Sequence, residues 1–166
     1  MLQTLFGGVI TPYNRKAAVA YAREWALKRN PAYLDFQALG GDCTNFASQV
    51  LYAGGLTMDR TPIYGWYYTD PYRRTASWTG VEYLYRHLLG LDTGRPRGAV
   101  VELDAVRPGD IVQLTFADQR FAHSPVVVAV EGATPQGILL AAHTYDAIDR
   151  PLSTYEYSGL RPIHIL

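Results

Sequence analysis

Residues 40–49 read Gly-Gly-Asp-Cys-Thr-Asn-Phe-Ala-Ser-Gln and contain Cys43, the only cysteine among 166 residues. Two glycines and an acid precede the cysteine and an apolar helical pattern follows it, so we expect a helix to begin at Cys43. The amino-terminus of a helix carries roughly half a positive charge, which favours thiolate over thiol. This position therefore makes Cys43 a candidate nucleophile.

A packing role for Cys43 has to be weighed against that interpretation. A lone cysteine usually behaves as a small buried hydrophobe. Helical spacing also places Cys43 on one face with Phe46 and Val50, which is typical of core residues. A catalytic role for Cys43 therefore requires a base elsewhere in the chain.

The composition favours a single domain over residues 1–166. Apolar residues make up 48% of the chain, and fifteen basic side chains balance fifteen acidic ones, so charge gives no argument for nucleic acid or an anionic membrane as a partner. One cysteine excludes an intramolecular disulfide, and no paired Cys/His spacing indicates structural zinc. We expect a monomer with no cofactor and no metal.

The segment Met1–Ile10 is apolar, but it has no positively charged region and no small-residue cleavage site, and it is too short to span a bilayer. We therefore expect no signal peptide and no integral membrane segment. A domain trimmed from a longer secreted protein would have the same sequence, so the compartment stays open between the cell wall and the cytoplasm.

The first ninety residues show helical patterns. We expect helices over 12–29, 43–53 and 80–89. Thr11-Pro12 is typical of a helix start, and Gly54-Gly55 is typical of a helix end.

After residue 97 the period changes, and short β-branched runs predict strands. Residues 131–137 are rich in turn formers and are expected to join two antiparallel neighbours. Helices followed by strands predict an α+β fold, with the N-terminal helices packed on one side of a C-terminal antiparallel sheet. The expected strands are 99–101, 111–114, 126–130, 138–142 and 162–166.

Two of the four histidines are well placed to act on the thiol. His123 precedes the strand that ends at residue 130, and His143 ends the next strand. In an antiparallel hairpin the start of one strand lies beside the end of the next, so the two imidazoles should be close. We expect His123 to be the base and His143 the group that orients it, with Asp146 as a competing orienter.

Other polar residues have simpler expected roles. We expect His87 at the surface, His164 at a sheet edge or in the core, and Asp110 in a turn. Asp42 is expected to cap the helix or to help place the thiol, although its charge opposes thiolate formation.

Aromatic residues gather between positions 64 and 85. Their flat, amphipathic side chains suit sugars or peptides, and they would equally well order a long loop. We expect residues 64–78 to form one wall of a substrate cleft. The expected substrate contacts are Asp42, Tyr64, Trp66, Trp78 and Asp146.

Four stretches of the chain resemble a known family. Together they are similar to the bacterial putative amidase domain family, which belongs to the papain-like superfamily of NlpC-type and CHAP cell-wall hydrolases. The resemblance extends from about residue 13 to residue 152, and its most specific part is the block around the cysteine. The four stretches are residues 41–49, 107–112, 123–124 and 143–146.

The resemblance implies a papain-like cysteine hydrolase. Cys43 matches the nucleophile, His123 matches the base, and His143 matches a third polar position where a histidine commonly stands. It also implies cleavage of an amide bond in peptidoglycan through a thioester, without a metal. The backbone N–H of Cys43 is the natural first oxyanion donor, and the second is unassigned, with Asp42 and Gln37 as candidates.

Three other functions remain open from the sequence. An acyltransferase or a protein deamidase would use the same thioester, because the shape of the cleft selects the acceptor. A zinc site would take Cys43, His123 and His143 as ligands. A non-catalytic cell-wall binding module would keep the fold and the aromatic cleft.

Overall fold

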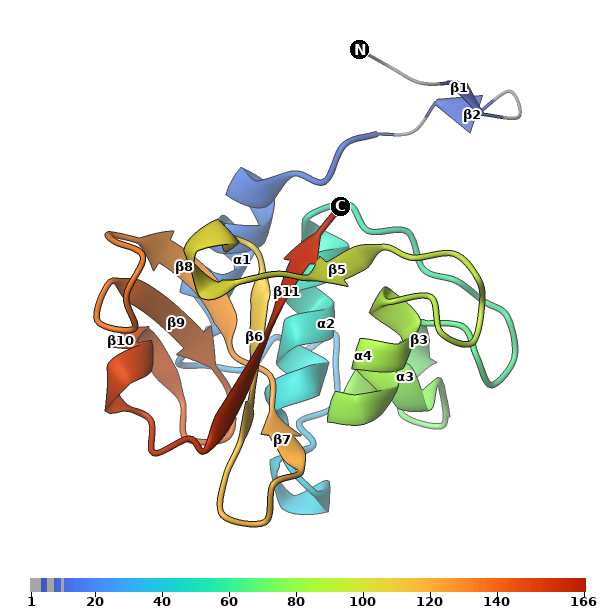
Figure 1. The fold of residues 1–166 in the computed structure, drawn as a ribbon. Coiled ribbons are helices and arrows are strands. Elements are labelled where there is room, and N and C mark those ends of the chain that lie inside the picture. Colours follow the sequence, from blue (N-terminus) through green and yellow to red (C-terminus); the bar gives the residue numbers. More distant parts are fainter. Residues whose placement is uncertain (1–3, 6–7, 10) are drawn as a thin grey trace.

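A computed structural model describes residues 4–5, 8–9 and 11–166 (Figure 1). Helices occupy the first part of these residues and most strands the second, and the strands pair antiparallel, so the predicted α+β class is confirmed. The expectation that Met1–Ile10 is not a signal peptide concerns a segment that lies largely outside the described residues. No helix in the described ranges is long and apolar enough to cross a membrane.

The predicted helix bounds agree best with the structure where glycines define the ends of a helix. The second helix was predicted within a residue at each end, but the first begins later than Thr11-Pro12 suggested. Its N-cap is Asn14, whose side chain accepts a hydrogen bond from Ala17 N at 3.0 Å. The α-helices are α1 (Arg15–Trp25), α2 (Cys43–Ala53), α3 (Ala76–Thr79) and α4 (Val81–Leu88), and short 3-10 helices are η1 (Gln37–Leu39), η2 (Leu103–Ala105) and η3 (Leu152–Thr154).

One seven-stranded antiparallel sheet forms the second part of the fold. Its order is β10-β9-β8-β6-β11-β5, and β7 pairs with β6. The strands of this sheet are β5 (Gly98–Val100), β6 (Ile111–Thr115), β7 (Phe121–His123), β8 (Val126–Val130), β9 (Ile138–Ala142), β10 (Ala147–Pro151) and β11 (Gly159–Ile165). The two small hairpins outside it are β1 (Thr4–Leu5) with β2 (Gly8–Val9), and β3 (Tyr68–Asp70) with β4 (Arg73–Arg74).

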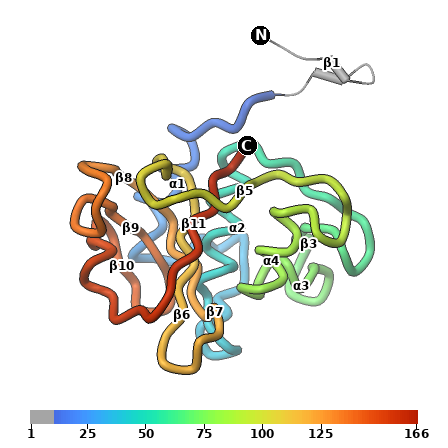
Figure 2. Tube along the Cα trace, in the orientation of Figure 1, coloured from blue at the N-terminus to red at the C-terminus, as the bar shows by residue number. Residues whose placement is uncertain are grey.

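The last strand of the described chain lies inside the sheet. β11 runs between β6 and β5 and pairs with both (Figure 2). The sequence predicted a shorter strand here and gave no information about its neighbours. The sequence did not predict β10, which is an irregular strand. Asp149 within it adopts a left-handed backbone (φ 51°), and the register with β9 shifts there, so its residues do not alternate as in a regular strand.

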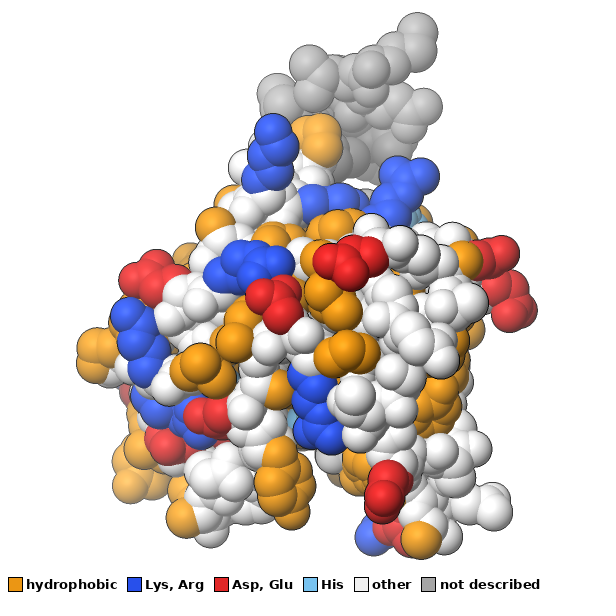
Figure 3. All heavy atoms as spheres, turned by 90° about the vertical axis from the view of Figure 1, so that its left-hand side faces the viewer, with side chains coloured by type: hydrophobic (Ala, Val, Ile, Leu, Met, Phe, Trp, Pro, Cys, Tyr) orange, Lys and Arg blue, Asp and Glu red, His pale blue; other side chains and the backbone are white. Residues whose placement is uncertain are grey.

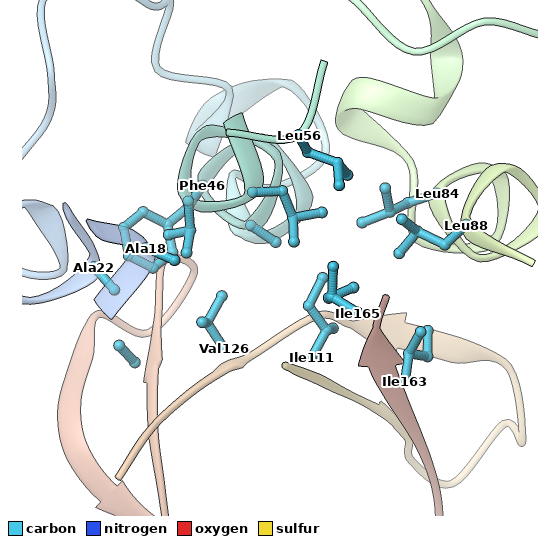
Figure 4. Packing of buried hydrophobic residues seen from close by; sticks show 14 of the residues in the cluster. Ala18, Ala22, Phe46, Leu56, Leu84, Leu88, Ile111, Val126, Ile163 and Ile165 are labelled. Atoms are coloured by element: carbon cyan, nitrogen blue, oxygen red, sulfur yellow. The ribbon is translucent and has the colours of Figure 1, made fainter. Parts of the chain in front are cut away.

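The helices pack on one face of the sheet. Alanines of α1, Phe46 of α2 and leucines of α4 meet Ile111, Val126, Ile163 and Ile165 of the strands (Figure 4). The opposite face carries a second apolar cluster, which includes Val112, Leu114 and Tyr155. Ile111 and Val112 thus point to opposite sides, as successive strand residues do.

The central helix, α2, is buried along most of its length. Its residues 43–51 are all less than a tenth exposed, although Thr44, Asn45, Ser48 and Gln49 are polar. A helix that is buried all round needs partners for such side chains, and here neighbouring segments supply them. The motif around the cysteine therefore contributes to packing as well as to the candidate site.

Candidate active site

Cys43 lies against the strand that carries His123. Its side chain is at the first position of α2 and the residue is 7% exposed. The sulfur lies 4.0 Å from the carbonyl oxygen of Ala122 and 3.8 Å from Thr44 Oγ1, and it also contacts the backbone of Ser124. The thiol is thus held beside the residues that immediately flank His123.

The environment of Cys43 keeps the sulfur protonated. Burial raises the pKa of the thiol above its usual value, and the charge of Asp42 acts in the same direction. Hydrogen bonds from the Ser124 backbone and from Thr44 partly oppose that change. Desolvation therefore outweighs the effect that the sequence suggested for a helix start.

His123 is buried next to the second apolar cluster. It pairs across the sheet with Leu114, which belongs to that cluster, and its ring centroid lies 5.9 Å from that of Tyr155. Its Nε2 atom is buried and has no hydrogen-bond partner among the described residues. Burial, with a smaller contribution from Arg150, lowers the pKa of His123 to about 4, so the imidazole is neutral near pH 7 and can accept a proton.

His143 does not orient His123, and this prediction is wrong in the structure. Its Nδ1 atom lies 2.5 Å from Asp42 Oδ2, and its Nε2 atom donates to the carbonyl oxygen of Trp25 at 2.8 Å. The ring also stacks on Phe46, with centroids 4.2 Å apart. Both ring nitrogens are therefore occupied on the helix side of the sheet, and none is left for His123.

Asp42 is a buried connector. Its Oδ1 atom accepts hydrogen bonds from Phe36 N at 2.8 Å and Asn45 Nδ2 at 2.9 Å, and its own N–H donates to Thr144 Oγ1 at 2.8 Å. It makes no side-chain capping bond to α2 and is 0% exposed, so the expected cap and substrate contact are both wrong. Through these contacts Asp42, the residue before Cys43, is bound to His143 and Thr144, which directly follow β9.

Asp146, the competing orienter, is bound elsewhere. Its carboxylate pairs with Arg29 at 2.8 Å, near the surface. The shortest distance between Arg29 and Asp42 is 3.7 Å, so Arg29 links the two acids rather than either histidine. Asp146 therefore does not contact His123.

The aromatic segment does not wall a cleft at the thiol. Trp66 and Trp78 are 0% exposed. The indole N–H of Trp66 donates to Ser48 Oγ at 3.0 Å, and that of Trp78 donates to Asn45 Oδ1 at 3.0 Å, so both bond to α2. Tyr64 is 56% exposed and lines a different hollow. The expected substrate contacts from the two tryptophans are therefore wrong, because these side chains belong to the core.

Two further polar residues were predicted with different outcomes. His87, expected at the surface, is 3% exposed and its Nδ1 atom faces the carbonyl oxygen of Tyr64 at 3.3 Å. Asp110 closes the predicted turn, because its N–H donates to the carbonyl oxygen of Arg107 at 3.0 Å. It is also 0% exposed and binds Arg15 at 2.7 Å and His164 at 2.9 Å. Asp110 thus joins the start of α1 to the sheet.

A cavity of about 720 Å³ opens beside His123. Sequence reasoning missed most of it, because its walls come from four separate loops and strand ends. Ala122, whose carbonyl oxygen contacts the thiol, is among the lining residues. The lining comprises Phe116, Ala117, Ala122, His123, Thr144, Tyr145, Arg150, Thr154, Tyr155 and Glu156.

The described residues contain no cluster of three His, Cys, Asp or Glu side chains arranged to hold a metal ion. Cys43, His123 and His143 therefore do not come together as the ligand set that the zinc hypothesis required.

On the face that includes β8, β9 and β10, basic and acidic side chains are interspersed (Figure 3).

The fold and the site together define an α+β protein with a helix-start thiol held beside a histidine-bearing strand and a cavity. Comparison with known families makes the class more specific. The chain belongs to the family described as "Putative amidase domain", whose sequence model matches residues 12–166. This membership supports amide hydrolysis as the general activity and indicates an enzyme.

One curated protein is similar to this chain in sequence. The chain is 36% identical over 154 residues to a protein of Bacillus subtilis (strain 168) named "Uncharacterized protein YhbB". The match covers 90% of this chain and 47% of the relative, so the chain spans about half the length of that protein. No solved structure matches the chain.

Proposed function

We propose that the protein is a papain-like cysteine amidase in which Cys43 is the nucleophile and His123 is the base. The observation that carries this proposal is the contact of the Cys43 sulfur with the backbone on both sides of His123, at Ala122 and Ser124. Family membership supports the reaction class. The contact supports the choice of residues.

The resting pair is neutral in this proposal. A raised thiol pKa and a lowered imidazole pKa both oppose a preformed thiolate–imidazolium pair. His123 therefore acts as a general base that removes the proton during attack. No hydrogen bond joins Cys43 to His123 among the described residues, and catalytic hydrogen bonds commonly tighten only when substrate is bound.

The reaction proceeds in two balanced stages. The sulfur of Cys43 attacks the amide carbonyl carbon while its proton passes to His123, and the backbone N–H of Cys43 stabilises the oxyanion. The C–N bond then breaks, the amine leaves with the proton from His123, and a thioester remains. Water attacks the thioester, His123 takes a proton from it, and return of that proton to sulfur releases the acid.

The substrate class that we propose is the peptide part of peptidoglycan. The resemblance of the cysteine and histidine motifs to cell-wall hydrolases supports this choice. The cavity beside His123 also has a size typical of small-ligand sites and can take part of a peptide chain.

The test is incubation of purified peptidoglycan with the wild type, Cys43→Ala and His123→Ala, with products read by mass spectrometry. We expect new free amino groups without new reducing sugar ends for the wild type, and a loss of at least about a thousandfold in both variants. Tyr72→Ala is the control, because this side chain is 97% exposed and does not line the cavity. Wild-type activity in Cys43→Ala would exclude the proposed nucleophile.

The same products separate the other hypotheses. A product ligated to an added amine would indicate an acyltransferase, whereas hydrolysed peptide indicates an amidase. Labelling of Cys43 by iodoacetamide should increase as the pH rises above neutral, because its thiol pKa is raised. Complete absence of both labelling and turnover would favour a non-catalytic binding module.

A further inference from the structure

Tyr155 lines the cavity and carries a buried hydroxyl next to Arg150. The residue is 8% exposed, and its hydroxyl makes no hydrogen bond of ordinary geometry among the described residues, although the Arg150 guanidinium acts on it. Leaving a buried hydroxyl unpaired costs free energy, so natural folds usually pair it or use it. Tyr155 lines the same cavity as His123, whose buried Nε2 is also unpaired.

Arg150 adds an uncompensated positive charge to the same cavity. Its guanidinium lies 3.7 Å from the centroid of the Tyr155 ring. Two hydrogen bonds to Thr154, at 2.9 Å to Oγ1 and 3.0 Å to the carbonyl oxygen, fix its orientation. These bonds leave further N–H groups of the guanidinium free to donate.

No carboxylate neutralises Arg150 within the described part of the chain. The ion pairs there involve other arginines, and none includes Arg150. Glu156 is the only acid among the cavity-lining residues; it is exposed and is not paired with Arg150. The charge of Arg150 also acts to lower the pKa of both His123 and Tyr155. The cavity is therefore electropositive next to His123.

We propose that the cavity binds a carboxylate of the peptide substrate, held by the Arg150 guanidinium and by a hydrogen bond from the Tyr155 hydroxyl. This inference rests on the proposed function and specifies its substrate as an acidic peptide. Both protein groups donate and a carboxylate only accepts, so one carboxylate satisfies both. Burial raises the pKa of the Tyr155 hydroxyl, which keeps it protonated and able to donate.

Binding is measured on the Cys43→Ala protein, so that no turnover occurs. The probes are a peptidoglycan stem tripeptide of alanine, glutamate and lysine with its carboxylates free, and the same tripeptide with carboxamides in their place. By calorimetry we expect the acid form to bind about tenfold tighter or more, because a charged partner strengthens a hydrogen bond. Equal affinities for the two forms would overturn the proposal.

Arg150→Gln in the same background should abolish the preference for the acid form. The matched control is Arg60→Gln, because Arg60 also lies over a tyrosine ring, that of Tyr67, and also has no carboxylate partner in the described ranges, but it is outside the cavity. We expect the control to keep the preference. A preference that survives in Arg150→Gln would exclude this arginine as the carboxylate site.

Tyr155→Phe separates a binding role from a structural one. Removing an unpaired buried hydroxyl should leave the free energy of unfolding unchanged or higher, while binding of the acid tripeptide weakens several-fold. Tyr21→Phe is the comparison, because its hydroxyl donates to Gln49 Oε1 at 2.6 Å and accepts from Asn30 at 2.9 Å, and its loss should destabilise. Lower stability with unchanged binding in Tyr155→Phe would contradict the proposed role.

The two proposals fail in different ways. If Cys43→Ala still hydrolyses peptidoglycan, the cysteine mechanism is wrong, whatever the tripeptide measurements give. If Cys43→Ala is inactive and binds both tripeptides equally, the mechanism stands and the carboxylate site is wrong.

Discussion

His143 and His123 lie at neighbouring strand ends but in opposite chemical conditions. His143, on the helix side, has both ring nitrogens within hydrogen-bonding distance of acceptors, Asp42 and the Trp25 carbonyl oxygen. His123 has a buried Nε2 without a partner in the described residues. A fully paired polar group stabilises a fold, whereas an unpaired one costs free energy. The difference indicates that His143 has a structural role, whereas His123 keeps a ring nitrogen available for a proton or a ligand.

The strongest test of that difference is Asp42→Ala. It leaves His143, the Phe36 N–H and the Asn45 amide without their acceptor in a buried position. We expect the free energy of unfolding to fall by roughly 3–5 kcal/mol. Urea unfolding, read as a lower midpoint at constant slope, measures the loss.

The control for this change is Asp146→Ala. Asp146 and Asp42 both contact Arg29, but Asp146 is partly exposed, and a surface ion pair contributes about 1 kcal/mol or less. Equal losses of unfolding free energy in the two variants would show that the buried Asp42–His143 pair contributes no more to stability than the surface ion pair of Asp146.

The next effect is the pH dependence of stability carried by His123. Its pKa is about 4 in the folded protein against an ordinary value of 6.5, so between those pH values the unfolded chain binds a proton that the folded chain does not. Stability should therefore fall as the pH drops from 6.5 to 4, by up to about 3 kcal/mol from this group. Urea unfolding across this range measures it.

His123→Gln removes the group that titrates and should flatten that part of the profile. The stability difference between the wild type and His123→Gln should thus shrink or change sign towards pH 4. Parallel profiles for the two proteins would show that His123 is not a buried neutral imidazole.

The smallest predicted effect concerns the aromatic segment. Trp78→Phe removes the hydrogen bond to Asn45 and leaves a gap in the core, so we expect a loss of about 2 kcal/mol. Tyr64→Ala changes an exposed side chain and should alter stability by about 0.5 kcal/mol or less. Thermal unfolding compares the stability of the two variants. A larger loss of stability in Tyr64→Ala than in Trp78→Phe would contradict the assignment of Trp78, and not Tyr64, to the core.

The sequence predicted the elements that carry strong local signals. The helix 43–53 is bounded by a glycine pair on each side, and the strands at 111, 126 and 138 are runs of β-branched and other apolar residues. β10 contains Asp, Arg and Pro and bends through a left-handed residue, so its strand character comes from pairing with β9 rather than from propensity.

The candidate site was predicted only in part, for a reason of geometry. The family resemblance implied that Cys43 and His123 act together, and in the structure the Cys43 sulfur contacts Ala122, the residue before His123. Local sequence signals could not give the side of the sheet on which each imidazole lies, because a shift of one residue in register reverses every side chain. Arg150 and Tyr155 carry no local signal at all, and only the packing of β10, η3 and the residue after η3 places them in the cavity that His123 lines.

The position of β11 also has a consequence for synthesis on the ribosome. β5 and β6 do not pair with each other, and β11 joins them only after every other described strand has been made. In a nascent chain that lacks β11, the edges of β5 and β6 that β11 would cover stay unpaired, and unpaired strand edges favour aggregation. Pairing between residues that are distant in the sequence also makes folding slow. We therefore expect the sheet to close late, after the helices and the β8–β9–β10 meander have formed.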